Sequence, residues 1–148
     1  MNKELIYKTI KSEISSRVKE IHKALSNQKE SLNTASESSA GDKHNTSRAM
    51  MHIEEEKLGK QLAQLIQLNK VLIKVNPKKN FDQITLGSFV ETNNGALYIA
   101  VPLGKISLKN KEIMCISLAS PIGQALQGKK AGESVQFNGQ LWEVKKIL

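Results

Sequence analysis

A short polar stretch, residues 33–47 (NTASESSAGDKHNTS), holds the side chains best suited to chemistry. It contains two carboxylates, Asp42 and Glu37, which are five residues apart. Carboxylate side chains of this kind can ligate a hard divalent cation. Asp42 could equally cap a helix, because an aspartate oxygen accepts free backbone N–H groups at a helix start. The residues alone leave both roles open.

Other polar residues around the stretch give weaker indications. His44 and His52 lie eight residues apart, a spacing of no compact zinc motif, and there is no second cysteine, so we expect no intrinsic metal site. Taken alone, Lys43 and Arg48 are solvated basic residues. The acidic run 54–56 is expected to stabilise the positive start of a second helix.

Two helical segments flank the stretch and must position it. Apolar residues recur at helical, near-heptad spacing before and after it, which is typical of a coiled-coil seam. Residues 1–76 are therefore expected to form an antiparallel coiled-coil hairpin with its tip at about 33–47. A parallel coiled coil between two chains is the alternative. Met50 and Met51 adjoin the seam and are expected to pack. The seam residues are Ile6, Ile10, Ile14, Val18, Ile21, Leu25 and Leu32, then Met51, Leu58, Leu62, Leu65, Ile66, Leu68 and Leu72.

The composition changes at Pro77, after which short β-type runs alternate with turn signals. The pairs Asn94-Gly95 and Asn138-Gly139, each flanked by strand-like sequence, predict hairpins. Pro121 is suited to the first turn of a short helix. Residues 77–148 are thus expected to form a small antiparallel β domain with one short helix, and the whole chain an α+β fold.

Charge and cysteine content restrict the class of protein. The net charge is +8, shared equally between residues 1–75 (13 Lys+Arg, 9 Asp+Glu) and 76–148 (9 and 5). Such an excess favours a polyanionic neighbour, either nucleic acid or an acidic protein surface. The single Cys115 fits a reducing compartment. With no export signal and no apolar run of membrane-spanning length, we expect a cytoplasmic protein that does not act at a membrane.

Residues 120–137, SPIGQALQGKKAGESVQF, resemble the signature of the bacterial Gre transcript-cleavage factors. The order of parts is also similar: an N-terminal antiparallel coiled coil, a polar tip and a small FKBP-like domain. The resemblance covers the whole chain in architecture, and it is close in residues over about 118–137.

The resemblance implies a partner and a mode of action. Gre factors bind bacterial RNA polymerase and insert the coiled coil into its secondary channel. Acidic tip residues then help to hold a metal ion beside the polymerase's Mg2+, so that the polymerase cleaves backtracked RNA. This implies nascent RNA at the tip near Lys43 and Arg48, and no cofactor or small-molecule substrate of the chain's own. A loop that docks on the polymerase corresponds here to Ser120, Pro121, Ile122 and Gly123.

The tip departs from the family motif, which reads Gly-Asp, two variable residues, then Glu-Asn. This chain keeps Gly41 and Asp42 but has Asn45 in place of the glutamate. Glu37 is the nearest acid that could substitute. Two interpretations follow: a factor that stimulates RNA cleavage, and a regulator that occupies the channel without cleaving.

Two further functions are less well supported. An FKBP-type peptidyl-prolyl isomerase would need an aromatic-lined pocket, but most aromatic residues after Pro77 alternate as strand core. A plain coiled-coil scaffold would not need the tail motif. The aromatic residues concerned are Phe81, Phe89, Tyr98, Phe137 and Trp142.

Overall fold

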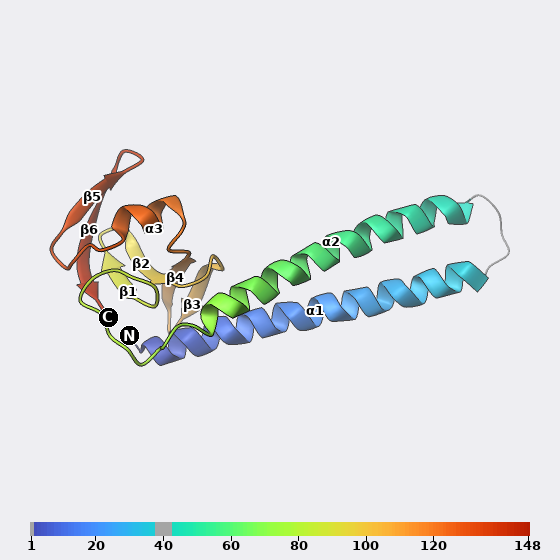
Figure 1. Ribbon diagram of the computed structural model, residues 1–148, viewed down its shortest axis with the longest axis horizontal. Coiled ribbons are helices and arrows are strands. Elements are labelled where there is room, and N and C mark those ends of the chain that lie inside the picture. The colour runs from blue at the N-terminus through green and yellow to red at the C-terminus, as the bar shows by residue number, and fades with distance from the viewer. Residues whose placement is uncertain (1, 38–42) are drawn as a thin grey trace. The chain divides into compact units, whose positions relative to one another are not determined.

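The computed structural model describes the backbone of residues 2–37 and 43–148, and the side chains of residues 2–30 and 48–148. Two long helices, α1 (Lys3–Glu37) and α2 (Lys43–Leu72), precede the strands (Figure 1). The chain forms two compact units: Ser12–Gln67, and Met1–Lys11 together with Leu68–Leu148. None of the described helices is long and apolar enough to cross a membrane.

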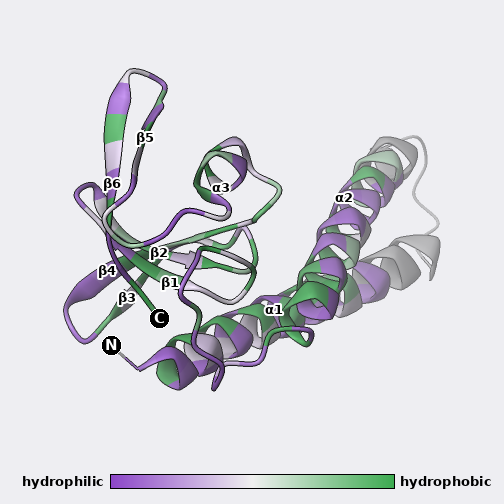
Figure 2. Ribbon diagram, turned by 60° about the vertical axis from the view of Figure 1, so that its left-hand side comes forward, coloured by the Kyte–Doolittle hydropathy of each residue, from purple (hydrophilic) through white to green (hydrophobic). Residues whose placement is uncertain are grey.

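The unit Ser12–Gln67 is an antiparallel pair of helical arms within one chain, as predicted. Ala24 and Gln28 of α1 line the same hollow as Met51 and Leu58 of α2, so the later part of α1 lies against the early part of α2. Hydrophobic and hydrophilic residues alternate along both arms (Figure 2). Among the side chains of this unit that the structure describes, the buried ones are Ile14, Ile21 and Leu65.

The seam differs from the predicted one in two respects. Ile66 is 47% exposed, because it follows the buried Leu65 and one residue turns the side chain by about 100° around the helix. Within residues 22–30 and 48–64, no side chain is fully buried. The tightly packed part of the seam therefore lies away from the predicted tip.

The second unit contains a six-stranded sheet in the order β3-β4-β2-β1-β6-β5. A short helix, α3 (Pro121–Leu126), precedes the last two strands. The strands are β1 (Phe89–Thr92), β2 (Gly95–Ile99), β3 (Gly104–Leu108), β4 (Lys111–Ile116), β5 (Ser134–Phe137) and β6 (Gln140–Ile147).

The sheet is mixed, whereas an antiparallel sheet was predicted. β2 and β4 pair in parallel, with Tyr98 opposite Cys115, and the other pairs are antiparallel. After β2 the chain crosses to the edge of the sheet to form β3. It then turns back and forms β4, which lies between β3 and β2. This return uses a two-residue turn, Lys109 and Asn110, with positive φ angles of 48° and 64°. Sequence reasoning did not predict this turn.

Both predicted hairpins are present. The β5–β6 turn is Asn138-Gly139, with φ angles of 50° and 77° that suit these residue types. The β1–β2 turn is shifted by one residue, because Thr92 pairs with Gly95 and leaves two asparagines, 93 and 94, in the turn. The Asn93 side chain explains the shift: it donates to Leu141 O (2.9 Å) and accepts from Glu143 N (2.7 Å).

Each face of the sheet carries its own buried side chains, since successive strand residues point to opposite sides. On one face lies a cluster of Ile84, Val90, Leu97, Ile99, Leu126 and Val144. On strand β2, Tyr98 points to the other face and is fully buried. The ends of the helices belong to this same unit: Tyr7 Oη donates to Leu72 O (3.2 Å). Ile6, Ile10, Leu72 and Val75 are also buried.

A buried lysine connects the start of α1 with the segment before the sheet. Lys3 is 4% exposed, and its Nζ donates to Lys79 O and lies 4.8 Å from the centroid of the Phe81 ring. Burial lowers the pKa of Lys3, because a low-dielectric surrounding disfavours the charged form.

Candidate functional site

The predicted acidic tip lies largely outside the described residues. Asp42 falls outside them, while α1 ends at Glu37 and α2 begins at Lys43, with Asn45 close behind. The side chains of these last three residues also lie outside the described part. The two tip carboxylates, and the place of Lys43 near RNA, therefore stay predictions.

Arg48 is the first residue of α2 whose side chain is described, and it is half-buried. Its Nε atom is buried and has no hydrogen-bond partner in the described part of the chain, as is also true of Gln28 Oε1. Gln28 belongs to the hollow between the arms, together with Asn27 and Glu54. Polar side chains thus take the place of apolar ones between the arms in the region of Gln28 and Arg48. The predicted contact of Arg48 with RNA is untested.

The acidic run 54–56 does not lie at the start of a helix, contrary to expectation. Since α2 begins at Lys43, the run is three turns further on, where the helix dipole has little effect. Glu55 lies 3.7 Å from His52 Nδ1, and Glu56 lies 3.7 Å from Lys60 Nζ. These are exposed pairs on one helix, which contribute little stability.

No group of three His, Cys, Asp or Glu side chains that could hold a metal ion occurs among the described residues. His52 is 66% exposed and pairs with Glu55, and the side chain of His44 lies outside the described part. The described residues therefore offer no metal centre to build on.

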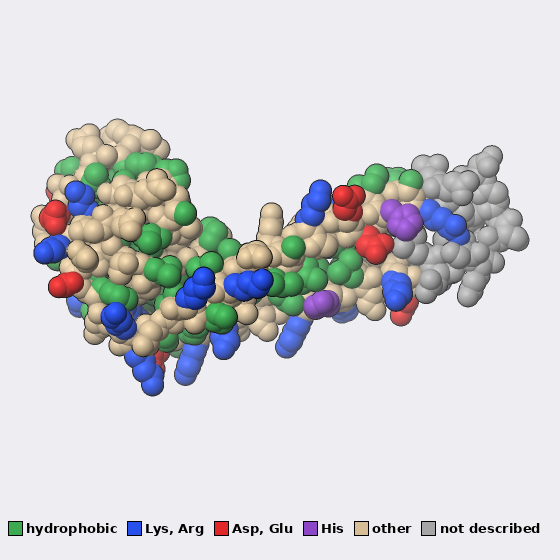
Figure 3. Space-filling view, in the orientation of Figure 1, with side chains coloured by type: hydrophobic (Ala, Val, Ile, Leu, Met, Phe, Trp, Pro, Cys, Tyr) green, Lys and Arg blue, Asp and Glu red, His purple; other side chains and the backbone are tan. Residues whose placement is uncertain are grey.

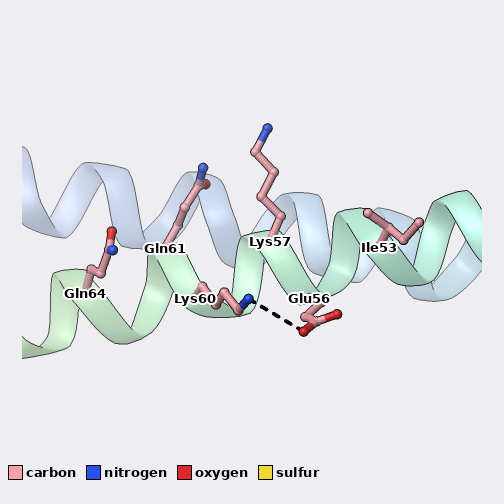
Figure 4. Close-up of a pocket in the computed structure, with 6 residues that line it drawn as sticks. All are labelled: Ile53, Glu56, Lys57, Lys60, Gln61 and Gln64. Atoms are coloured by element: carbon pink, nitrogen blue, oxygen red, sulfur yellow. Dashed lines mark ion pairs between the residues drawn. The ribbon is translucent and has the colours of Figure 1, made fainter.

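The outer face of α2 carries exposed apolar and basic side chains. Met50 and Ile53 are each 67% exposed, so the packing predicted for Met50 is wrong, whereas Met51 is half-buried. Figure 4 shows a shallow hollow on this face. The side chains that line it are Ile53, Glu56, Lys57, Lys60, Gln61 and Gln64.

The predicted docking loop begins with a helix cap. Ser120 is the N-cap of α3: its Oγ accepts a hydrogen bond from Gly123 N (3.1 Å) and donates one to Ser117 O (2.6 Å). Pro121 is the first helical residue, as predicted, and is exposed. The fixed φ of proline suits this position, and its missing N–H costs nothing there.

Gly123 and Ile122 also have structural roles in this loop. Gly123 is buried, and a Cβ added to it would lie 2.3 Å from Ser117 O and 2.8 Å from Leu118 O. Ile122 is half-buried and packs against the core cluster. Of the four predicted docking residues, only Gly123 is buried, and Ser120, Pro121 and Ile122 keep accessible surface for a partner.

The rest of the tail motif is also explained by the fold. Gly128 and Gly132 have positive φ angles of 80° and 92°, which favour glycine. Their N–H groups donate to Ile84 O and Val144 O, each at 2.8 Å. The Glu133 carboxylate accepts from Lys130 N (2.9 Å). The motif thus specifies how α3 joins the sheet, which is a requirement of folding before any partner is considered.

The aromatic residues of this unit are mostly committed to its interior. Phe89 and Tyr98 are 1% and 0% exposed, and Trp142 packs against the core cluster. Burial raises the pKa of Tyr98 from 10.0 to about 12, with smaller effects of Tyr7 and Cys115. Burial likewise raises the pKa of the Cys115 thiol to about 12, so this thiol is protonated and poorly reactive at neutral pH.

Two solved structures are similar to the chain. One, the GreA factor homolog 1 (Gfh1) protein of Thermus thermophilus, is 19% identical, with 93% of each chain covered and a TM-score of 0.38. The other, of the transcription factor Gfh1, is 20% identical, with 92% of this chain and 91% of that chain covered and a TM-score of 0.36. No protein-family model matches the chain, and no curated protein matches its sequence.

Proposed function

We propose that this chain is a Gre-like transcription factor that binds bacterial RNA polymerase and places its helical hairpin in the secondary channel. One observation carries the proposal: two long antiparallel helices occur in the same chain as the loop SPIGQALQGKKAGE. A hairpin of this length can carry a tip far into a narrow channel, since each helical residue adds about 1.5 Å. The protein would then act in the cytoplasm.

Docking on the polymerase is assigned to the α3 loop. Because Ser120 and Gly123 are needed to build the loop, the contact itself would come from Pro121, which is exposed, and from the open side of Ile122. These two are apolar and adjacent, and they stand on a capped helix whose N-cap residue hydrogen-bonds to Ser117 O. A rigid apolar anchor of this kind is what protein interfaces favour.

At the tip, Asp42 and Glu37 are proposed to supply carboxylate oxygens near the Mg2+ of the polymerase. Lys43 and Arg48 would lie near the phosphates of the nascent RNA. The polymerase itself would break the RNA bond, so the chain needs no cofactor and is not an enzyme on its own. Asp42 is the only acid between Glu37 and Glu54 in the sequence. Its loss should therefore reduce RNA cleavage more than the loss of any other tip residue.

The test uses stalled elongation complexes with backtracked RNA. Wild type should shorten the RNA, Asp42→Ala should lose this activity, and Glu37→Ala should reduce it. Both variants should still compete with wild type for the polymerase, while Ile122→Asp should not compete. A chain that fails to bind the polymerase at all would refute the family inference as well as the cleavage mechanism.

A second function is favoured by one residue. Asn45 stands where the family motif has its glutamate, and an amide oxygen brings no charge to a metal shell. With a single motif acid, the chain could occupy the channel and regulate transcription without cleavage. Wild type that competes for the polymerase but shortens no RNA would establish this alternative.

A further inference from the structure

The chain contains two Asn-Gly pairs, and asparagine followed by glycine is the dipeptide most prone to lose its side-chain ammonia spontaneously. The backbone nitrogen of the second residue attacks the side-chain carbonyl carbon of the first, and glycine has no side chain to hinder this approach. The pairs are Asn94-Gly95 and Asn138-Gly139. All four residues are exposed, so exposure does not distinguish the two sites. Their hydrogen bonds do.

The turn at Asn94 is held in place. Asn94 Nδ2 donates to Leu141 O (3.1 Å), and Asn94 N donates to Thr92 Oγ1 (3.1 Å). Gly95 already belongs to β2, where it pairs with Thr92, and its carbonyl oxygen accepts from Thr92 Oγ1 (2.7 Å). The Asn94 carboxamide is therefore directed towards β6. It cannot turn to the Gly95 nitrogen until these contacts break.

The turn at Asn138 is not held in this way. Asn138 and Gly139 lie between the last residue of β5 and the first residue of β6. Among the residues that the structure describes, neither the Asn138 side chain nor the Gly139 N–H has a hydrogen-bond partner. Figures 1 and 2 both show this turn projecting from the sheet, and Figure 3 shows neither charged nor hydrophobic side chains at its tip on the face in view.

The strands that carry the two turns also differ. β5 is an edge strand that pairs only with β6, whereas β1 and β2 each have a partner strand on both sides. No residue of β5 is buried, but Val90 of β1 and Leu97 and Tyr98 of β2 are. Regions with few buried side chains open locally at low cost in free energy. The end of the β5–β6 hairpin should therefore give the Asn138 carboxamide the freedom that Asn94 lacks.

We propose that Asn138 is a site of spontaneous deamidation and isomerisation in the folded protein, and that Asn94 is protected from this reaction. Hydroxide removes the N–H proton of Gly139, the nitrogen forms a bond to Asn138 Cγ, the Cγ–Nδ2 bond breaks and ammonia leaves. Water then opens the succinimide ring at Cγ to give aspartate, or at the backbone carbonyl carbon of residue 138 to give isoaspartate. Because a base starts the reaction, its rate should rise with pH.

The isoaspartate product should disturb the hairpin. It places the Cβ of residue 138 in the main chain, so that the two-residue turn becomes longer by one atom. Turn geometry fixes the register of a hairpin, and here it sets Val135 opposite Trp142. Both side chains pack against the core cluster. Conversion should therefore loosen the hairpin and expose Trp142, the only tryptophan of the chain, whose fluorescence emission would move to longer wavelength.

The experiment follows the full chain during incubation at neutral and at mildly alkaline pH, both folded and unfolded in urea. Mass spectrometry of peptides measures deamidation at each site, and an isoaspartate-specific methyltransferase detects the isomerised product. In the folded chain the rate at residue 138 should exceed that at residue 94 by at least about tenfold, because the hydrogen bonds of Asn94 must break first. In urea the two rates should be similar, since both sites then have only the Asn-Gly sequence in common.

Two variants provide a matched comparison. Asn138→Gln should remove most of the isoaspartate that the folded chain forms, and its tryptophan emission should not change on ageing. Asn94→Gln should form as much isoaspartate as wild type. Circular dichroism checks that both variants are folded, and the wild-type comparison decides the question if either is not.

Three outcomes would overturn the proposal: equal rates at the two sites in the folded chain, faster conversion at residue 94, or conversion at residue 138 in urea alone. Each would mean that the hydrogen bonds and strand positions described above do not control the reaction. The measurements involve no polymerase, so this proposal and the proposed function can fail separately.

Discussion

The backbone at Gly123 lies so close to the Ser117 carbonyl that a Cβ at Gly123 would be 2.3 Å from the oxygen. This contact brings α3 against the segment that follows β4, and the Ser120 cap hydrogen-bonds both residues. The glycine in the SPIG motif is therefore explained by close packing, without reference to any partner.

Gly123→Ala should destabilise the protein by about 2–3 kcal/mol, because the neighbouring atoms are backbone and cannot move aside cheaply. The matched control is Gly59→Ala. Gly59 lies inside α2 with nothing within 4 Å of an added Cβ, so alanine should stabilise the protein by about 0.5–1 kcal/mol. Urea unfolding of the full chain measures both. If Gly123→Ala were as stable as wild type, the backbone at residue 123 would have to move away from Ser117 and Leu118 at little cost.

Ser120 allows capping and docking to be separated. Ser120→Ala removes the hydrogen bonds to Gly123 N and Ser117 O and should cost about 1 kcal/mol, whereas Ser120→Thr keeps a hydroxyl and should cost less. At a temperature where both variants are folded, both should bind RNA polymerase like wild type. Weaker binding by the folded alanine variant would mean that the Ser120 hydroxyl contacts the polymerase directly.

Several features of the fold could be predicted because they are local. The turn at Asn138-Gly139 and the helix opened by Pro121 depend on the backbone preferences of those residues. The parallel pairing of β2 with β4 and the exposure of Ile66 could not be predicted, since both depend on which segments meet in space. Asp42 was recognised from the family motif, whereas Glu37 was named only because it is the nearest other acid.

Tyr98 should make the protein sensitive to alkaline pH. Its hydroxyl is buried and has no hydrogen-bond partner in the part of the chain that the structure describes. Burial raises the pKa of Tyr98 from 10.0 to about 12, so the folded state keeps this proton to a higher pH than the unfolded chain. The resulting stability is complete below pH 10 and is lost as the pH rises from 10 towards 12.

Tyr98→Phe should remove this loss while keeping the ring in the core. At pH 7 the variant should be at least as stable as wild type, by up to about 1 kcal/mol, because no hydrogen bond is broken. Above pH 10 the variant should become increasingly more stable than wild type. Cys115 and Lys3 titrate in both proteins, so the difference in stability between wild type and variant is due mainly to Tyr98. Denaturant midpoints from pH 7 to pH 12 measure it, and a variant less stable at pH 7 would reveal a partner for the hydroxyl.

Asn45 provides the sharpest test of the tip. Asn45→Glu restores the acid of the family motif three residues after Asp42, and a second carboxylate should strengthen the hold on a divalent cation. On stalled elongation complexes, this variant should cleave backtracked RNA at least about tenfold faster than wild type, which corresponds to about 1.4 kcal/mol of the activation barrier.

Asn45→Gln is the matched control, because it lengthens the side chain without adding charge, and it should cleave like wild type. Adding Asp42→Ala to Asn45→Glu should abolish the gain, since the two carboxylates are proposed to act on one ion. An Asn45→Glu variant that competes for the polymerase as well as wild type, yet cleaves no faster, would mean that residue 45 does not reach the metal. The expectation transferred from the family motif to this position would then be wrong, and the channel-occupying regulator would be the better description of the chain.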